Sequence, residues 1–451
     1  MGASGERFEL ADKLTRAFLE SHWKAESIAE SGAACLGQWP RWMPALAQRV
    51  ATVFRVAPLE RRDELFELIV DFLDRQVGTD AITTPPVPMR TIGEQPPTMP
   101  VRRRRTPEWP VPAIPTVREL AQRLELSDGQ LEWLADVRGL ERTVAREQLR
   151  NYRYRTVPRS GAVPRVIEAP KMRLKEIQRW ILHEVLSQVP AHPAAHGFVS
   201  GRSVVTHAEL HTGQPAVLRL DLKDFFASVP AGRVYRIWLA LGYARPVAHA
   251  LTGLTTNALP VSVWPHVAAA TDPQAVQSRF GLGRQLATPH LPQGAPTSPA
   301  LANLAAFRLD RRLAGLAQSS GLNYSRYADD LTFSGTARLI RRRPEFEAVT
   351  RAIVRAEGFG LNDDKAVTQA AGGRQTVCGV VVNAHTNVRR TDYDRLRAVL
   401  RNAATGDPAS QNRDRVEDFR AHLLGRISWV EALNPARGRR LRELFAAIDW
   451  T

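Results

Sequence analysis

The sequence has only two cysteines among its 451 residues, Cys35 and Cys378, which lie far apart and outside any cluster of histidines. This spacing excludes a disulfide framework and a zinc motif, and it suits a reducing compartment. The sequence also lacks an apolar run of about 20 residues, and its first residues are polar and charged rather than apolar. We therefore expect neither secretion nor membrane insertion, and we predict a cytoplasmic protein without a membrane partner.

Acidic residues are the scarcer charged class, with 46 Asp plus Glu against 62 Lys plus Arg, so the formal net charge is +16. A surplus of this size attracts polyanions and releases their counterions, which makes nucleic acid the first partner to consider. Arginines on a solvated surface would give the same composition without such a role. With 44% hydrophobic residues, the chain is long enough to bury several cores.

The first 84 residues are predicted to form a small all-α domain, because apolar residues recur there at helical spacing. Trp23, Trp39 and Trp42 in this segment suit core or interface positions better than a base-stacking platform. Residues 85–115 contain ten prolines and the run Arg102 to Arg105, a composition that predicts a linker. Its arginines either follow a phosphate backbone or remain solvated.

Helical spacing returns after Thr116 and changes near Tyr152 to alternation, with turn signals at Gly161 and Pro164. Strands and helices then interchange, which predicts an α+β domain over residues 116–385. Residues 386–451 again have helical spacing and are predicted to be helical.

Two adjacent aspartates, Asp329 and Asp330, lie in the segment NYSRYADDLTFS, residues 323–334. The apolar residues on either side predict two short strands joined by a tight turn, with both aspartates at its tip. Neighbouring carboxylates repel each other unless a cation or a shared proton offsets the repulsion, which favours a metal site. An ordinary polar turn could contain the same pair.

A third carboxylate comes from AVLRLDLKDFF, residues 216–226, which is typical of a strand that ends at Asp221 before a bend. Phosphoryl transfer from a nucleoside triphosphate by two Mg²⁺ ions about 3.5 to 4 Å apart needs oxygen ligands from several elements. Asp221, Asp329 and Asp330 would supply such a set, as catalytic and metal-binding residues.

The segment LPQGAPTSPALAN, residues 291–303, predicts a loop followed by a helix that Thr297 or the adjacent serine caps. Gln293 and the backbone donors of the loop could line a nucleotide pocket. A proline-rich turn before a helix needs no ligand, so this alternative stays open.

In chain order, AVLRLDLKDFF, LPQGAPTSP, YADD, GFGLNDDK and VCGVVVN resemble the palm segments of reverse transcriptases. Two further segments, RVIEAPKMRLKEIQ (165–178) and HGFVSGRS (196–203), are most similar to the retron type. The resemblance covers residues 116–450 and implies a right-hand polymerase. Residues 116–385 would be the fingers and a palm with an antiparallel sheet, and residues 386–451 a helical thumb, after the N-terminal domain (1–84) and the linker (85–115).

The resemblance also implies roles for individual residues. The three aspartates would bind two Mg²⁺ ions, and Phe226 would stand at the steric gate that favours dNTPs, although a core phenylalanine fits the same position. Four other residues would contact the dNTP or its leaving pyrophosphate: Gln293, Arg165, Lys175 and Lys365. The charges of the last three could instead be simply solvated.

Two signatures that retron enzymes use to bind their own RNA are altered here. The first has His207 in place of asparagine, followed by His211, and the second reads Val377-Cys378-Gly379, with cysteine in place of threonine. The resemblance implies RNA binding by these residues, and the departures weaken the expectation of the usual grip. Cys378 could instead be a small hydrophobic strand residue.

The function implied is RNA-directed DNA synthesis on a cognate structured noncoding RNA that serves as template and primer. The product would be a branched, RNA-linked single-stranded DNA (msDNA) with a part in antiphage defence. Partners would be that RNA, the nascent DNA, dNTPs, a host RNase H and an effector, which is either the N-terminal segment or a separate protein. The alternatives are a group II intron-like or other defence-associated reverse transcriptase, or an RNA-binding scaffold without catalysis.

Overall fold

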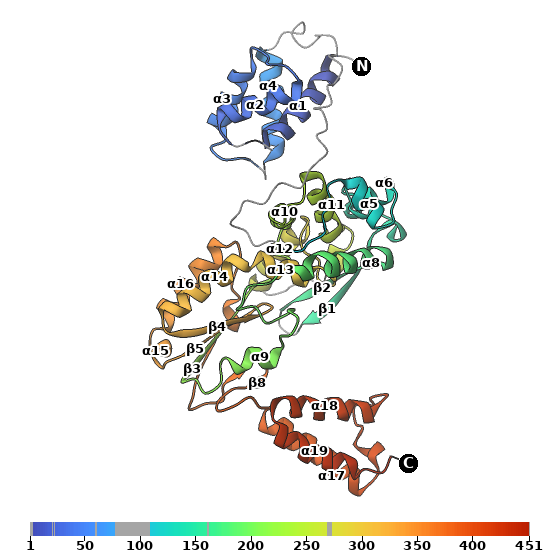
Figure 1. Cartoon of the computed structure of the whole chain (residues 1–451), viewed down its shortest axis with the longest axis vertical. Helices are drawn as coiled ribbons and strands as arrows, with labels where there is room; N and C mark the ends of the chain where they lie inside the picture. The colour runs from blue at the N-terminus through green and yellow to red at the C-terminus, as the bar shows by residue number, and fades with distance from the viewer. Residues whose placement is uncertain are drawn as a thin grey trace. The chain divides into compact units, whose positions relative to one another are not determined.

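The computed structural model describes residues 3–58 except positions 20 and 22, and residues 61–76, 109–159, 162–267 and 273–450. The chain divides into two compact units, Met1–Gln95 and Pro96–Thr451, which are described separately (Figure 1). Most of the predicted linker, including Arg102 to Arg105, lies outside the described residues.

The N-terminal unit contains four described helices: α1 (Ala3–Leu19), α2 (Ala25–Leu36), α3 (Met43–Val53) and α4 (Arg62–Gln76). Their apolar faces form one core, which includes Phe18, Leu46, Leu65 and Ile69, as the spacing predicts. Trp23 and Trp42 pack against this core, whereas Trp39 is 56% exposed and does not contribute to it. The predicted all-α character of this segment is therefore confirmed for its described residues.

The second unit begins with short helices and a β-hairpin, as the change of spacing near Tyr152 predicts. Thr116 and Ser127 accept hydrogen bonds from backbone N–H groups in the first turns of α5 and α6, so each caps its helix. The elements are α5 (Val117–Arg123), α6 (Asp128–Leu134), α7 (Leu140–Thr143), β1 (Tyr152–Arg159), β2 (Ala162–Pro170) and α8 (Met172–Trp180).

An antiparallel sheet forms the centre of this unit, in the order β4-β5-β3-β6. Its strands are β3 (Ala216–Asp221), β4 (Leu322–Tyr327), β5 (Asp330–Gly335) and β6 (Val367–Ala370). One face carries Leu218, Leu220, Leu331 and Phe333, which join the main core. Since side chains alternate along a strand, Val217, Arg219 and Thr332 lie on the other face.

Helices that follow β3 and β5 in the chain cover the apolar face of the sheet. Phe333 meets Phe346 of α16 edge-on, with ring centroids 5.0 Å apart. The α-helices between α8 and β6 are α9 (Val204–Glu209), α10 (Ala231–Ala240), α11 (Arg245–Thr255), α12 (Pro273–Leu286), α13 (Ser298–Ala305), α14 (Phe307–Ser319), α15 (Arg338–Arg341) and α16 (Arg343–Ala356).

The chain continues through a two-stranded hairpin, β7 (Thr376–Val377) and β8 (Val380–Val381), into three helices. These are α17 (Arg390–Thr405), α18 (Phe419–Leu433) and α19 (Pro435–Ala446), which confirms the helical prediction for this segment. Leu396, Ile427 and Leu441 form a second core, which Val217 of β3 joins. The C-terminal helices and the hairpin thus share a core with the sheet face opposite the main core.

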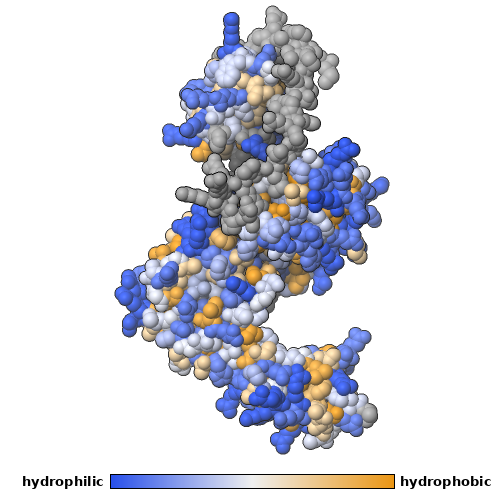
Figure 2. Space-filling model, viewed as in Figure 1, coloured by the Kyte–Doolittle hydropathy of each residue, from blue (hydrophilic) through white to orange (hydrophobic). Residues whose placement is uncertain are grey.

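Figure 2 shows hydrophilic residues over most of the visible face, with apolar residues in small groups between them. Among the described residues, no helix combines the length and the apolar character that crossing a bilayer requires.

Candidate active site

The three predicted aspartates lie on adjoining strand ends. Asp221 is the last residue of β3, and its partner across the antiparallel ladder is Asp330, the first residue of β5. Asp329 precedes it in the turn from β4, and its carbonyl oxygen accepts a hydrogen bond of 2.8 Å from the backbone N–H of Leu222. The sheet therefore brings together the two acidic segments, which are 108 positions apart in the sequence.

The turn itself differs from the prediction that both aspartates sit at its tip. Tyr327 pairs with Asp330, so the turn consists of Ala328 and Asp329 alone. Ala328 has a φ of +56°, a left-handed conformation that a tight two-residue turn requires. Gly197 lies against this turn, and a Cβ at Gly197 would come within 2.5 Å of the Ala328 nitrogen. Asp330 thus belongs to the strand and Asp329 to the turn.

A buried ion pair between Arg326 and Asp310 stabilises the turn. The guanidinium of Arg326 binds both carboxylate oxygens of Asp310 in α14, at 2.8 and 2.6 Å, and both side chains are fully buried. A further guanidinium nitrogen donates to the carbonyl of Ala328 at 2.8 Å. Arginine is suited to this position because its planar fork can satisfy several acceptors at once.

The carboxylates have different electrostatic surroundings. Burial raises the pKa of Asp329, and the nearby carboxylate of Asp221 raises it further. Asp221 itself forms an ion pair with Lys365, whose Nζ lies 2.9 and 2.8 Å from the two carboxylate oxygens. Asp221 already attracts the ammonium group of Lys365, and the charged form of Asp329 is disfavoured without a cation. These two carboxylates are therefore suited to bind a cation.

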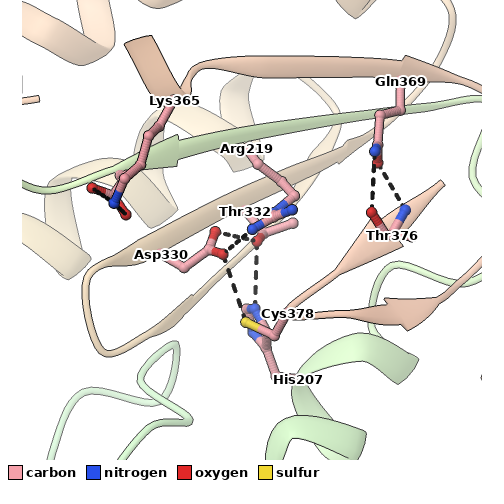
Figure 3. Close-up of polar contacts among 9 residues, drawn as sticks. His207, Arg219, Asp330, Thr332, Lys365, Gln369, Thr376 and Cys378 are labelled. Carbon is pink, nitrogen blue, oxygen red and sulfur yellow. Dashed lines mark hydrogen bonds and ion pairs between the residues drawn. The ribbon is translucent and has the colours of Figure 1, made fainter. Parts of the chain in front are cut away.

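Asp221 and Asp329 therefore fit divalent ions, while the Asp330 carboxylate has a different partner in this structure. Its carboxylate accepts a hydrogen bond of 2.5 Å from Arg219, in a part-buried ion pair. Figure 3 shows Arg219, Thr332 and Cys378 grouped around Asp330, while Lys365 lies apart from them. In the described ranges, no group of three or more His, Cys, Asp and Glu side chains is arranged to hold a metal. The predicted three-carboxylate set is thus not assembled in this structure.

The predicted nucleotide-binding residues come from several elements. Phe226 follows the bend after β3 and is half-buried, with its ring centroid 6.1 Å from that of Phe198. Arg165 is exposed on β2, and Lys175 is half-buried on α8. With Gln293, the predicted nucleotide-binding residues number five. Of these, Lys365 forms an ion pair with one of the three aspartates, Asp221.

Gln293 is half-buried in its loop, and its carbonyl oxygen accepts a 2.8 Å hydrogen bond from the N–H of Glu168. The helix begins after Thr297, as predicted, but the Thr297 hydroxyl is buried without a partner. The hydroxyl of Ser298 donates to Pro292 instead. The predicted side-chain cap is therefore wrong, because no side chain accepts a hydrogen bond from the first turn of this helix.

A buried polar group that the sequence did not reveal holds this loop against β2. The carboxylate of Glu168 lies 2.8 Å from His290 and accepts from Asn257 at 2.6 Å, with both carboxylate and imidazole 1% exposed. Despite the cost of burial, the Glu168 carboxylate keeps the pKa of His290 above its usual value. The only signal in the sequence was that His290 immediately precedes LPQG.

His207 and His211 are fully buried beneath the sheet rather than available to RNA. His211 lies 2.6 Å from the Ser334 hydroxyl and 2.7 Å from that of Ser325, which also contacts His207. Burial lowers the pKa of His207 to about 2 and that of His211 to about 3, so both are neutral. In this conformation neither side chain can make the predicted RNA contact.

The second altered signature forms the turn of the β7–β8 hairpin. Val377 is buried, and Cys378 and Gly379 have φ values of +46° and +84°. Cys378 is therefore a turn residue and not the strand hydrophobe considered as its alternative. Two consecutive positive φ values are typical of a type I′ turn, which favours glycine at its second position.

The comparisons with known proteins match this architecture. Residues 157–381 match the family described as reverse transcriptase (RNA-dependent DNA polymerase). The chain is 42% identical over 298 residues to the retron Mx65 reverse transcriptase of Myxococcus xanthus, covering 66% of this chain and 64% of the relative. It is 35% identical over 368 residues to the retron Mx162 reverse transcriptase of the same organism, covering 78% and 71%. The chain belongs to the retron reverse transcriptases.

The chain is also similar to a retron reverse transcriptase of Escherichia coli. The chain is 29% identical to the retron Ec86 reverse transcriptase over 301 residues, which cover 66% of this chain and 81% of the relative. The match to the Mx65 enzyme spans just under two thirds of that relative's length. The reverse transcriptase family model implies a polymerase fold of mixed helices and antiparallel sheet, as observed. The retron resemblance deduced from the sequence is thereby confirmed.

Proposed function

We propose that this retron reverse transcriptase copies part of a structured noncoding RNA into single-stranded DNA that stays attached to the RNA. The observation that carries the proposal is the convergence of Asp221 and Asp329, from two distant segments, at one edge of the sheet in a member of this family. In this assignment residues 116–385 are the fingers and palm and residues 386–451 the thumb. The product would be msDNA, with a role in antiphage defence.

The carboxylates of Asp221, Asp329 and Asp330 would hold two Mg²⁺ ions, with Asp330 released from its ion pair with Arg219. Bound there, these ions would neutralise charge on the attacking 3′ oxygen and on the leaving pyrophosphate. Lys365 would exchange its ion pair with Asp221 for contact with the leaving pyrophosphate, to which its Nζ can donate a proton. Arg165, Lys175 and Gln293 would orient the triphosphate and the base.

Selection of dNTPs would rest on Phe226. Its ring is half-buried and supported by Phe225 and Phe198, with centroids 5.7 and 6.1 Å away, so it cannot easily yield to a 2′-hydroxyl. We expect Phe226→Ala to raise rNTP incorporation relative to dNTP incorporation by about 10- to 100-fold, the range over which shape alone discriminates.

Steady-state incorporation of single dNTPs and rNTPs on one primed RNA would measure this ratio. Phe346→Leu is the matched control, since Phe346 of α16 packs against Phe333 on the core face of the sheet and its replacement should alter stability without altering discrimination. An unchanged ratio in Phe226→Ala would remove the gate assignment.

The function is tested in two stages with the full chain. First, the purified protein should extend an oligo(dT) primer on poly(rA) with dTTP and Mg²⁺. Second, RNA that copurifies with the protein is sequenced and supplied with all four dNTPs, and the product should contain DNA covalently joined to that RNA. Extension in the first stage without RNA-linked DNA in the second would retain the polymerase and reject the retron product. No extension at all would favour the scaffold alternative.

A further inference from the structure

Phe198 adopts a backbone conformation that is unusual for an aromatic residue. Its φ is +62°, in the left-handed region, where a residue with a Cβ atom is strained. Phe198 is also 49% exposed, so burial of the ring in a core does not account for this conformation. Strained residues persist where the surrounding structure fixes them, and they concentrate at active sites and ligand-binding segments. An exposed ring held in this way indicates a surface that receives a ligand.

Three elements around the candidate active site fix the backbone next to Phe198. The N–H of His196 donates to the carbonyl of Arg326 in β4, at 2.8 Å. Asn303 of α13, which is 2% exposed, donates to the carbonyl of Gly197 at 2.9 Å. Gly197 also packs against the β4–β5 turn, where a Cβ would meet the turn backbone. These contacts with the strand, the helix and the turn hold the Cα of Phe198 at a defined position.

The ring of Phe198 lies close to the two groups that would define the reaction centre. Its centroid is 6.1 Å from that of Phe226, which would stand beneath the sugar of the incoming dNTP. The preceding residue, Gly197, touches the turn that carries Asp329, a ligand for the ions at the primer's 3′ oxygen in the proposed reaction. Consecutive nucleotides of one strand are about 3.4 Å apart in a B-form duplex. A ring 6.1 Å from the gate can therefore reach the nucleotide next to the incoming dNTP, which is the primer terminus.

We propose that the Phe198 ring contacts the primer-terminal nucleotide and positions its 3′ oxygen for attack on the incoming dNTP. The proposal rests on the proposed function, because Phe226 and Asp329 mark the reacting groups only in a polymerase. A phenylalanine ring has no hydrogen-bonding group, so it would contact the sugar and the base edge through shape alone. The contact would accept every correctly paired terminus, whatever its base, and would fit a mispaired terminus less well.

The test compares three variants of the full chain with a matched control, Phe280→Ala, which removes a phenylalanine of α12 that is 67% exposed. Phe198→Ala and Phe198→Gly both remove the ring, but glycine tolerates a positive φ and should give the higher denaturation midpoint. Single-turnover extension of a matched primer should nevertheless fall by about 10-fold in both, with the half-saturating dNTP concentration changed by less than about threefold. Phe198→Tyr keeps the ring and should keep the rate, and Phe280→Ala should leave the rate unchanged.

Extension from a mismatched primer measures the specificity of the contact. Phe198→Ala should narrow the ratio of matched to mismatched extension by about 10-fold, a range within which shape discriminates. It should not produce the change in the dNTP-to-rNTP ratio that is expected for Phe226→Ala. Three results would overturn the proposal: unchanged extension in Phe198→Ala, rates that follow the denaturation midpoints so that glycine restores activity, or a change in the dNTP-to-rNTP ratio alone. The last would show that the ring only supports the gate.

Photocrosslinking separates this proposal from the proposed function, because it needs no dNTP. With p-benzoylphenylalanine in place of Phe198, the protein should crosslink to the 3′ nucleotide of a labelled DNA primer annealed to RNA. The same group in place of Phe280 should not crosslink there. If the parent protein extends no primer, the proposed function fails, while the crosslink still decides whether the ring contacts the primer terminus. Absence of the crosslink at position 198 would contradict the proposal.

Discussion

Replacing Asp329 with asparagine should reduce DNA synthesis by about 1,000-fold, equivalent to about 4 kcal/mol of transition-state stabilisation. The same change should stabilise the metal-free protein. Both effects have one cause. The Asp329 carboxylate is buried beside Asp221, so its charge destabilises the folded protein when no cation is bound. Single-turnover primer extension and denaturation in EDTA would measure the two effects on the same preparation.

The stabilisation should depend on pH in a defined direction. Because the native pKa of Asp329 is raised, its ionised form is disfavoured in the folded state, and stability is lost as the pH rises through that pKa. Asparagine has no such dependence, so its advantage should be present at pH 8 and disappear as the pH falls towards about 4, where the unfolded carboxyl is also protonated.

Asp221→Asn is the informative comparison for Asp329→Asn. It should also abolish synthesis, but it breaks the ion pair with Lys365 and so should not stabilise the protein in EDTA to the same degree. If Asp329→Asn were less stable than the parent at pH 8, the crowding of the two carboxylates would not be the dominant influence on Asp329.

The second large effect is expected for Arg326→Met, which should lower the free energy of unfolding by about 3 to 5 kcal/mol, the usual cost of breaking a buried ion pair. Asp310 would then remain fully buried with a charge and without its cation. The carbonyl of Ala328 would also lose a donor, so activity should fall along with stability. Denaturant unfolding followed by tryptophan fluorescence would measure the loss.

Arg326→Met combined with Asp310→Leu should be less destabilised than the sum of the two single variants, since neither charge is then left alone. Arg138→Gln, which breaks the exposed ion pair with Glu132, should have little effect on the midpoint. Additive losses in the double variant would show that packing, and not charge pairing, determines the cost at this position.

The sequence predicted the parts of the fold that local patterns control. Alternating residues on both sides of Asp329 predicted β4 and β5, and the strand before the bend was predicted to end at Asp221. The helical spacing of the C-terminal segment likewise predicted buried leucines such as Leu396. These features depend on periodicity of 2 or 3.6 residues, which a single sequence displays directly.

The environments of polar residues could not be predicted in the same way. Arg326 and Asp310 are charged residues of types that usually lie at the surface. Only the packing of α14 against β4 shows that they form a fully buried pair. His207 and His211 were expected to contact RNA because of their place in a signature, but the hydroxyl groups of three strand residues hold them inside. Long-range partners of this kind leave no local pattern.

The two-residue length of the β4–β5 turn has a consequence for how this chain can change. Along a strand, a slip of one position exchanges the two faces of the sheet. One additional residue between Tyr327 and Asp330 would require a longer turn of different shape or a shift of one ladder, and a shift of the β3–β5 ladder would move Asp330 away from Asp221. Insertions at this point would be lost from a functional library even when every side chain is retained, so loop length here is as constrained as residue identity.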